Sequence, residues 1–177
     1  MNKVTSLTVL ALCLAVCSCG GKTPTNTVNT STSGNWEVLM TGATGESSLL
    51  NFVTTFSVTN SGPLDFTAFS FFNDSACFAN GTNGSTETGT ASLTTSSTGA
   101  VTGTMSMSVT SVTPAGNVLT LNGNLTGTSN GTTSTTGTLS NGVVVGTWTL
   151  TGGAGDPSCI GSGDFLMCQG NDTCTAP

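Results

Sequence analysis

The sequence of 177 residues has no histidine, no tyrosine and no arginine, and its only basic side chains are Lys3 and Lys22. A serine nucleophile normally needs a histidine or lysine base, so the usual triads and Ser-Lys variants are excluded for the body of the chain. Nucleic-acid binding is excluded as well, because it depends on a footprint of lysine and arginine that displaces counterions. The formal net charge of −6 comes from eight carboxylates against the two lysines.

These carboxylates are the remaining groups on which catalysis could depend, and they lie at Glu37, Glu46, Asp65, Asp74, Glu87, Asp156, Asp164 and Asp172. A glycoside hydrolase needs two of them as an acid and base pair. Their scatter through turn-rich segments favours solvated loop charges instead, so we assign no catalytic residue. We also expect no metal and no cofactor, because the sequence has neither Cys-x-x-Cys or histidine ligands nor the Asp-x-Asp-x-Asp spacing of a calcium loop.

Threonine, serine, glycine and asparagine dominate the sequence, while only 6% of the residues are charged and the mean hydropathy is +0.20. Threonine and valine fit a pleated strand, and the 24 glycines together with asparagine supply turns. This composition argues against a charge-driven disordered chain. It predicts an all-β protein whose strands have one apolar face and one hydroxyl face.

The first twenty residues have the layout of an export signal. A short positive segment ending at Lys3 precedes an apolar run over residues 4–16. The sequence Val16-Cys17-Ser18-Cys19 then resembles the lipobox of bacterial lipoproteins, in which an aliphatic residue and a small residue precede the cysteine that is acylated. The resemblance implies a signal peptide over residues 1–18 and a lipid anchor on Cys19. Gly20 after that cysteine implies delivery to the outer membrane.

Other interpretations of this segment remain open. In the register Leu14-Ala15-Val16-Cys17 the lipid would be on Cys17, but valine then occupies the position where the signal peptidase prefers a small residue. The segment also fits an ordinary cleaved signal or a signal anchor. Residues 19–33 have almost nothing to bury and predict a flexible, disordered tether after the lipidated cysteine, and residues 34–177 predict a single β-domain.

From residue 34 onward, turn signals separate segments with a period of two, which predicts strands at residues 36–40, 52–59, 64–72, 88–95, 101–110, 118–126, 132–139 and 143–151. Pairs such as Asn141-Gly142 indicate hairpin turns. Successive strands with short turns predict an antiparallel meander of about 8 to 10 strands. We expect it to close as a small barrel, because this charge-poor chain cannot protect open edges with lysines. A β-sandwich is the alternative.

Two short motifs resemble known small barrels. Gly34-Asn35-Trp36 resembles the Gly-x-Trp opening of lipocalins, and Gly146-Thr147-Trp148 resembles a motif of avidin-like barrels. Lipocalins usually pair that tryptophan with a late arginine, which this chain lacks. The resemblance implies an interior that binds a small apolar ligand, lined by Trp36, Phe69, Phe71, Met105, Met107, Val109 and Trp148. The alternative is that these side chains simply fill the core.

Seven cysteines fall into an N-terminal group and a later set of four. In an exported chain the even set favours disulfides over metal ligands. We expect Cys77 to pair with Cys159, and Cys168 with Cys174, which would pin the C-terminal tail. Two other pairings are possible in principle.

These observations favour a non-enzymatic lipoprotein of the cell envelope that acts as a structural, adhesive or interaction module. Its expected partners are the membrane, through the lipid anchor, and an envelope protein or a glycan. The second hypothesis is a carrier of a small apolar ligand, and the third is a glycan hydrolase that uses carboxylates alone.

Overall fold

The computed structural model describes residues 29–42, 50–72, 77–78, 85–112, 115–131, 137–153, 158–170 and 174. The predicted signal peptide, Cys19 and the first part of the predicted tether lie outside the described residues. Within them every regular element is a strand, which confirms the all-β class. The ten strands are β1 (Thr30–Ser31), β2 (Gly34–Gly42), β3 (Phe52–Ser57), β4 (Ser61–Pro63), β5 (Asp65–Phe71), β6 (Ser85–Thr95), β7 (Ala100–Ser111), β8 (Val118–Ser129), β9 (Gly137–Thr151) and β10 (Gly161–Gln169).

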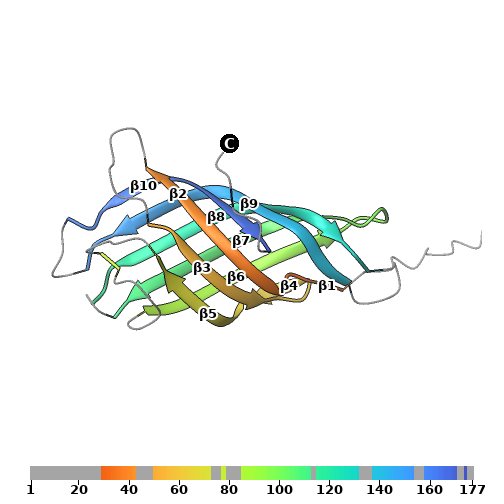
Figure 1. The fold of residues 1–177 in the computed structure, drawn as a ribbon, viewed down its shortest axis with the longest axis horizontal. Coiled ribbons are helices and arrows are strands. Elements are labelled where there is room, and N and C mark those ends of the chain that lie inside the picture. The colour runs from red at the N-terminus through yellow and green to blue at the C-terminus, as the bar shows by residue number, and fades with distance from the viewer. Residues whose placement is uncertain are drawn as a thin grey trace, which may run out of the picture.

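The strands form one sheet in the order β4-β6-β7-β8-β9-β10-β2-β3-β5, and β1 adds to β9 in parallel. Figure 1 shows this sheet wrapping around a common interior, with β2, β3 and β5 crossing over β7 and β8 in the view. All other pairs are antiparallel. The sheet is therefore a nearly closed barrel, as predicted, and not a sandwich.

The barrel stays unsealed along one seam. β4 pairs with β6, and Leu64 N donates to Gly89 O at 2.8 Å just beyond that pairing. The chain then continues into β5, which pairs with β3 and not with β6. The facing edges of β5 and β6 therefore separate beyond Leu64, and we call the opening between them the seam.

The period of two divides the strands into an inner and an outer face. On β7, Val101, Met105, Met107 and Val109 are at most 5% exposed, while the threonines and serines between them face outward. Alternation of this kind is typical of strands that bury one face and solvate the other. The faces predicted for residues 101–110 are confirmed.

Two predicted strands turn out to be one. The prediction of separate strands at residues 132–139 and 143–151 is wrong, because β9 runs through Asn141-Gly142 without a hairpin. Asn141 has a left-handed backbone (φ 51°), and the register against β8 shifts beside it, between Thr126 and Thr128. An extra residue in one strand is accommodated by such a bulge, so the turn signal marks a bulge here.

The sequence prediction also missed β10 and β1. β10 hydrogen-bonds β9 on one side and β2 on the other, where only a disulfide-pinned tail was expected. At the other end of the chain, Thr30 and Thr32 are fully buried, and Thr30 Oγ1 lies 3.0 Å from Thr95 Oγ1. The predicted domain boundary at Gly34 is therefore too late, because the barrel already includes residue 30.

Glycines on the inner face make room for the largest core side chains. A Cβ atom added at Gly142 would lie 2.6 Å from Trp36 Cη2, and one at Gly163 would lie 2.8 Å from Trp148 Nε1. Both separations are shorter than real contacts allow. Glycine at these positions lets the strands bend tightly and the indoles pack against backbone.

The structure pairs Cys77 with Cys159 and Cys168 with Cys174, as predicted. The first disulfide joins positions 82 residues apart and fastens the β5–β6 connection to the segment before β10. Buried Asn117 reinforces this attachment by donating from Nδ2 to Cys77 O at 2.8 Å. The second disulfide spans only 6 residues and holds Cys174 against β10.

Replacing Cys77 and Cys159 together by serine is expected to lower the free energy of unfolding by about 4 kcal/mol, because this disulfide closes a long loop. The matched double substitution of Cys168 and Cys174 releases a much shorter loop and is expected to cost about 2 kcal/mol. Guanidinium denaturation of both variants measures the two losses. Equal losses, or a larger loss in the second variant, would contradict the chain-entropy argument.

Candidate functional site

The seven side chains predicted to line a ligand cavity all belong to one buried core. Each of them is between 0% and 5% exposed: Trp36, Phe69, Phe71, Met105, Met107, Val109 and Trp148. A cavity large enough for a ligand would leave part of its lining accessible to a water-sized sphere. These values therefore favour the interpretation in which the side chains fill the barrel at these positions.

Both indoles also have their polar atom satisfied within the protein. Trp36 Nε1 donates to Thr32 O at 3.2 Å, and Trp148 Nε1 donates to Thr41 O at 3.1 Å. A buried tryptophan normally finds such a partner. Neither indole N–H is therefore available to orient a ligand in the interior.

The outer surface of β6 to β9 is a charge-free face of hydroxyl and amide groups, hollowed at its centre by a depression of about 580 Å³. We call the outward side chains around this depression the hydroxyl face: Thr90, Ser92, Thr104, Ser106, Asn122, Asn124, Val145 and Thr147. Ser106 Oγ donates to Asn122 Oδ1 at 2.7 Å, which fixes the orientation of that amide. The face thus offers hydrogen-bond donors and acceptors but no charge.

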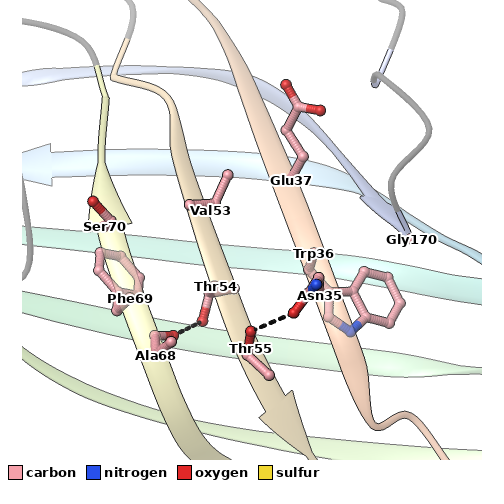
Figure 2. A pocket seen from close by; sticks show the side chains of 10 residues that line it. All are labelled: Asn35, Trp36, Glu37, Val53, Thr54, Thr55, Ala68, Phe69, Ser70 and Gly170. Atoms are coloured by element: carbon pink, nitrogen blue, oxygen red, sulfur yellow. Dashed lines mark hydrogen bonds between the residues drawn. The ribbon is translucent and has the colours of Figure 1, made fainter.

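A second depression, of about 480 Å³, lies over β2, β3 and β5 (Figure 2), and we call it the groove. Its outward-facing lining consists of Asn35, Glu37, Val53, Thr55, Ala68 and Ser70. Trp36 and Phe69 also border it but are buried at 1% and 4% exposure, so they form its underside. Val53, at 44% exposed, gives the groove an apolar patch.

Internal hydrogen bonds already engage part of the groove. Thr55 Oγ1 donates to Asn35 Oδ1 at 2.7 Å, as Figure 2 shows. Glu37, the only charged residue of the lining, accepts from Cys174 N at 3.2 Å through Oε2. The groove therefore resembles an ordinary polar surface more than a prepared ligand site.

The third depression, of about 340 Å³, lies at the seam and is lined by Phe66, Thr67, Ala68, Phe69 and Glu87. We call it the seam hollow. It shares Ala68 and Phe69 with the groove, so the two depressions flank β5. Glu87 Oε1 accepts from Ser85 Oγ at 2.7 Å, and both residues belong to β6. The seam hollow thus combines aromatic side chains with one carboxylate.

The four carboxylates of the described residues all lie in strands, whereas the sequence predicts acidic residues that are mostly in turns: Glu37 in β2, Asp65 in β5, Glu87 in β6 and Asp164 in β10. For Glu37 and Asp65 the strand is as predicted. The described parts of the three depressions contain at most one carboxylate each. They do not bring together the pair that a glycoside hydrolase needs. The other four acidic residues, Glu46, Asp74, Asp156 and Asp172, lie outside the described residues.

The described residues hold neither a metal-binding cluster nor a membrane-spanning helix. No group of three or more histidine, cysteine, aspartate or glutamate side chains there could hold a metal ion. The same residues contain no helix that is long and apolar enough to span a membrane.

One pattern in the sequence indicates that Glu87 belongs to the seam hollow, although the sequence prediction does not include it. In β6, Glu87, Gly89, Ala91 and Leu93 alternate with exposed threonines and a serine, and this alternation places the carboxylate on the inner face. The strand was predicted to begin at residue 88, one residue too late to include Glu87. Nothing in the sequence indicates which strand pair stays open.

Comparison with known proteins does not assign the chain to a family. No family model, no curated protein and no solved structure matches the chain significantly. A function therefore has to be argued from the residues of this chain.

The filled interior can be tested with N-phenyl-1-naphthylamine, an uncharged probe that fluoresces in apolar surroundings. The native protein is expected to show no saturable binding of the probe. Met107→Ala, at a core position only 1% exposed, is expected to lower the free energy of unfolding by about 2 to 5 kcal/mol because it removes packed volume. Stoichiometric binding by the native protein would instead favour the carrier hypothesis.

Proposed function

We propose that the protein is an exported, non-enzymatic lipoprotein of the cell envelope whose outer surface serves as a structural or adhesive contact. A lipid on Cys19 holds it to the outer membrane, and the partner is an envelope protein or a neutral glycan. The observation that carries the proposal is the contrast between the two faces of the barrel. Inward side chains fill the core, while the outward ones around the depression on β6 to β9 form the uncharged hydroxyl face.

The chemistry of the hydroxyl face supports a neutral partner. Hydroxyl and amide groups both donate and accept hydrogen bonds, and the hydroxyls of a sugar or the peptide groups of a protein offer the same combination. A face without charges gains nothing from an ionic partner. Its depression of about 580 Å³ provides concave contact area.

The proposed anchor fits the position of the barrel in the chain. Residues 20–28 separate Cys19 from the first described residue, and a segment of this length spans at most roughly 30 Å. Acyl chains on Cys19 would then hold the barrel close to the membrane surface. More than one acyl chain is needed for stable attachment, and a bacterial lipoprotein carries several.

The anchor is tested by Cys19→Ala. This variant is expected to lose incorporation of labelled palmitate and to move from the membrane fraction to the soluble fraction, because the acylated thioether cannot form. Cys17→Ala is the matched control and is expected to keep both the label and the membrane association. Labelling that follows Cys17 instead would place the anchor in the other register.

The hydroxyl face is tested by photocrosslinking in intact cells. A benzophenone amino acid introduced at Thr104 or Asn124 is expected to yield covalent adducts, because these outward residues border the depression. The same amino acid at Val53 on β3, which is 44% exposed and lies beyond β10 and β2 from the hydroxyl face, is the control and is expected to yield few adducts. Glycosidase or protease treatment of the adducts distinguishes a glycan from a protein partner. Equal yields at all three positions would contradict a contact role for the hydroxyl face.

A further inference from the structure

We propose that the seam is a docking site for an extended peptide segment that carries a basic side chain, added as a strand along the open edge of β6. This partner class makes the proposed function more specific. It rests on that function in one respect, which is that the partner is encountered in the cell envelope. Three observations support it: backbone on β6 that pairs with no described strand, a carboxylate at the same place, and a hollow beside it that is lined in part by Phe66 and Phe69.

Within the part of the chain that the structure describes, no strand pairs with the β6 edge at the seam. Gly89 O and Leu93 N both bond toward β4 and its flanking residues, at 2.8 Å and 2.6 Å. In a regular strand alternate residues point to the same edge, and the register of β6 against β7 shows no shift. The N–H and C=O groups of Ser85 and Glu87 therefore point into the seam. A strand added there would find both donors and acceptors.

The edge of β5 opposite is open as well. Phe72 N donates to Asn51 O on the β3 side, so the even-numbered residues from Ala68 onward bond toward β3. The backbone groups of Phe69 and Phe71 consequently point toward the seam. Two facing edges without mutual pairing are unusual in a barrel that is closed elsewhere.

The charge at the seam selects the partner. Glu87 lines the seam hollow from the inner side of β6 and is only partly exposed. The described residues include no lysine and no arginine, so no basic partner for Glu87 lies among them. A residue paired opposite Glu87 would place its side chain on the same face, beside the carboxylate. A lysine or arginine at that position compensates the charge, while a neutral or acidic residue does not.

The aromatic part of the seam hollow favours apolar residues on either side of the lysine or arginine that would lie opposite Glu87. Phe66 packs against the core from its partly buried position, and Phe69 is only 4% exposed. The residues of an added strand that face inward would contact these rings, and those between them would face solvent. The fitting segment therefore alternates apolar or basic residues with small polar ones.

The competing interpretation is that Glu87 acts only as a guard, which means that its charge prevents any other strand from pairing with the β6 edge. An inward-pointing charge on an edge strand prevents pairing with other strands, including a second copy of the same chain. A guard would repel every added strand, whereas a docking site admits a strand with a basic residue in register. The two interpretations differ in one measurable respect, which is the binding of matched peptides.

The probe is the capped heptapeptide Thr-Val-Thr-Lys-Thr-Val-Thr, added to the full chain purified in detergent, with binding followed by fluorescence anisotropy of a labelled peptide. We expect saturable binding, about tenfold weaker binding when glutamate replaces the lysine, and loss of binding when the backbone nitrogen of that lysine is methylated. Glu87→Lys is expected to reverse the preference between the two peptides, and Glu87→Gln to abolish it. Asp164→Lys and Asp164→Asn, at an exposed carboxylate away from the seam, are the matched controls and should leave the preference unchanged.

Several outcomes would overturn the inference. These are absence of binding of the lysine peptide at millimolar concentration, binding that survives backbone methylation, and a peptide preference that Glu87→Gln leaves intact. Self-association of Glu87→Gln without peptide binding by the native chain would identify Glu87 as a guard only. If Glu87→Lys fails to fold, judged by near-ultraviolet circular dichroism, Glu87→Gln decides the question. Failure here leaves the anchor and the hydroxyl face untouched, because acylation and crosslinking test those separately.

Discussion

The barrel depends on the hydrogen bonds of one strand, β10. It pairs with β9 along Gly161–Cys168 and with β2 along Gly163–Gln169, and so it joins the first strands of the sheet to the last ones. Without β10, the backbone links between the sheet β2-β3-β5 and the sheet β6-β7-β8-β9 among the described residues would be reduced to the short pairings of β4 and β1. The second disulfide, from Cys168 to Cys174, is attached to this same strand. A chain without surface lysines or arginines in its described part needs closure of this kind, since it cannot protect open edges with charge.

Closure around so many aromatic side chains is made possible by glycine. The rings of Phe52, Phe69 and Phe71 stack or meet edge to edge at centroid distances of 4.6 to 5.5 Å. Elsewhere in the barrel, inward glycines such as Gly142 leave the space into which an indole fits. A large side chain on one strand thus lies opposite a glycine on a neighbouring strand, and together they fill the described interior. Because these side chains occupy the interior, the contacts we propose fall on the outer surface and at the edge of the sheet.

Much of this fold could be predicted from local sequence. The alternation of Met105 and Met107 with threonine and serine fixes which face of β7 is buried, and the even set of four later cysteines indicates two disulfides. The errors arise where tertiary context decides. Asn141-Gly142 has the local chemistry of a hairpin turn, yet it forms a bulge because β8 continues alongside it. β10 contains two glycines and an aspartate and was overlooked, since its burial comes from neighbours on both sides rather than from its own composition.

The candidate site was harder to predict than the fold, because a seam is defined by a pairing that does not occur. The hydrophobic pattern of each strand would be the same whether or not β5 and β6 paired with each other. The two edges separate after β4, where the chain enters β5 and pairs with β3 instead of β6. Within β5 the register against β3 also shifts, opposite Thr55 and Phe56. A bulge strengthens the local twist and bends the strand, which here turns β5 away from β6. The sole carboxylate of β6 lies beside that opening. Because every other side chain of β6 is uncharged, Glu87 distinguishes the edge at the seam and gives it the proposed preference for a basic partner.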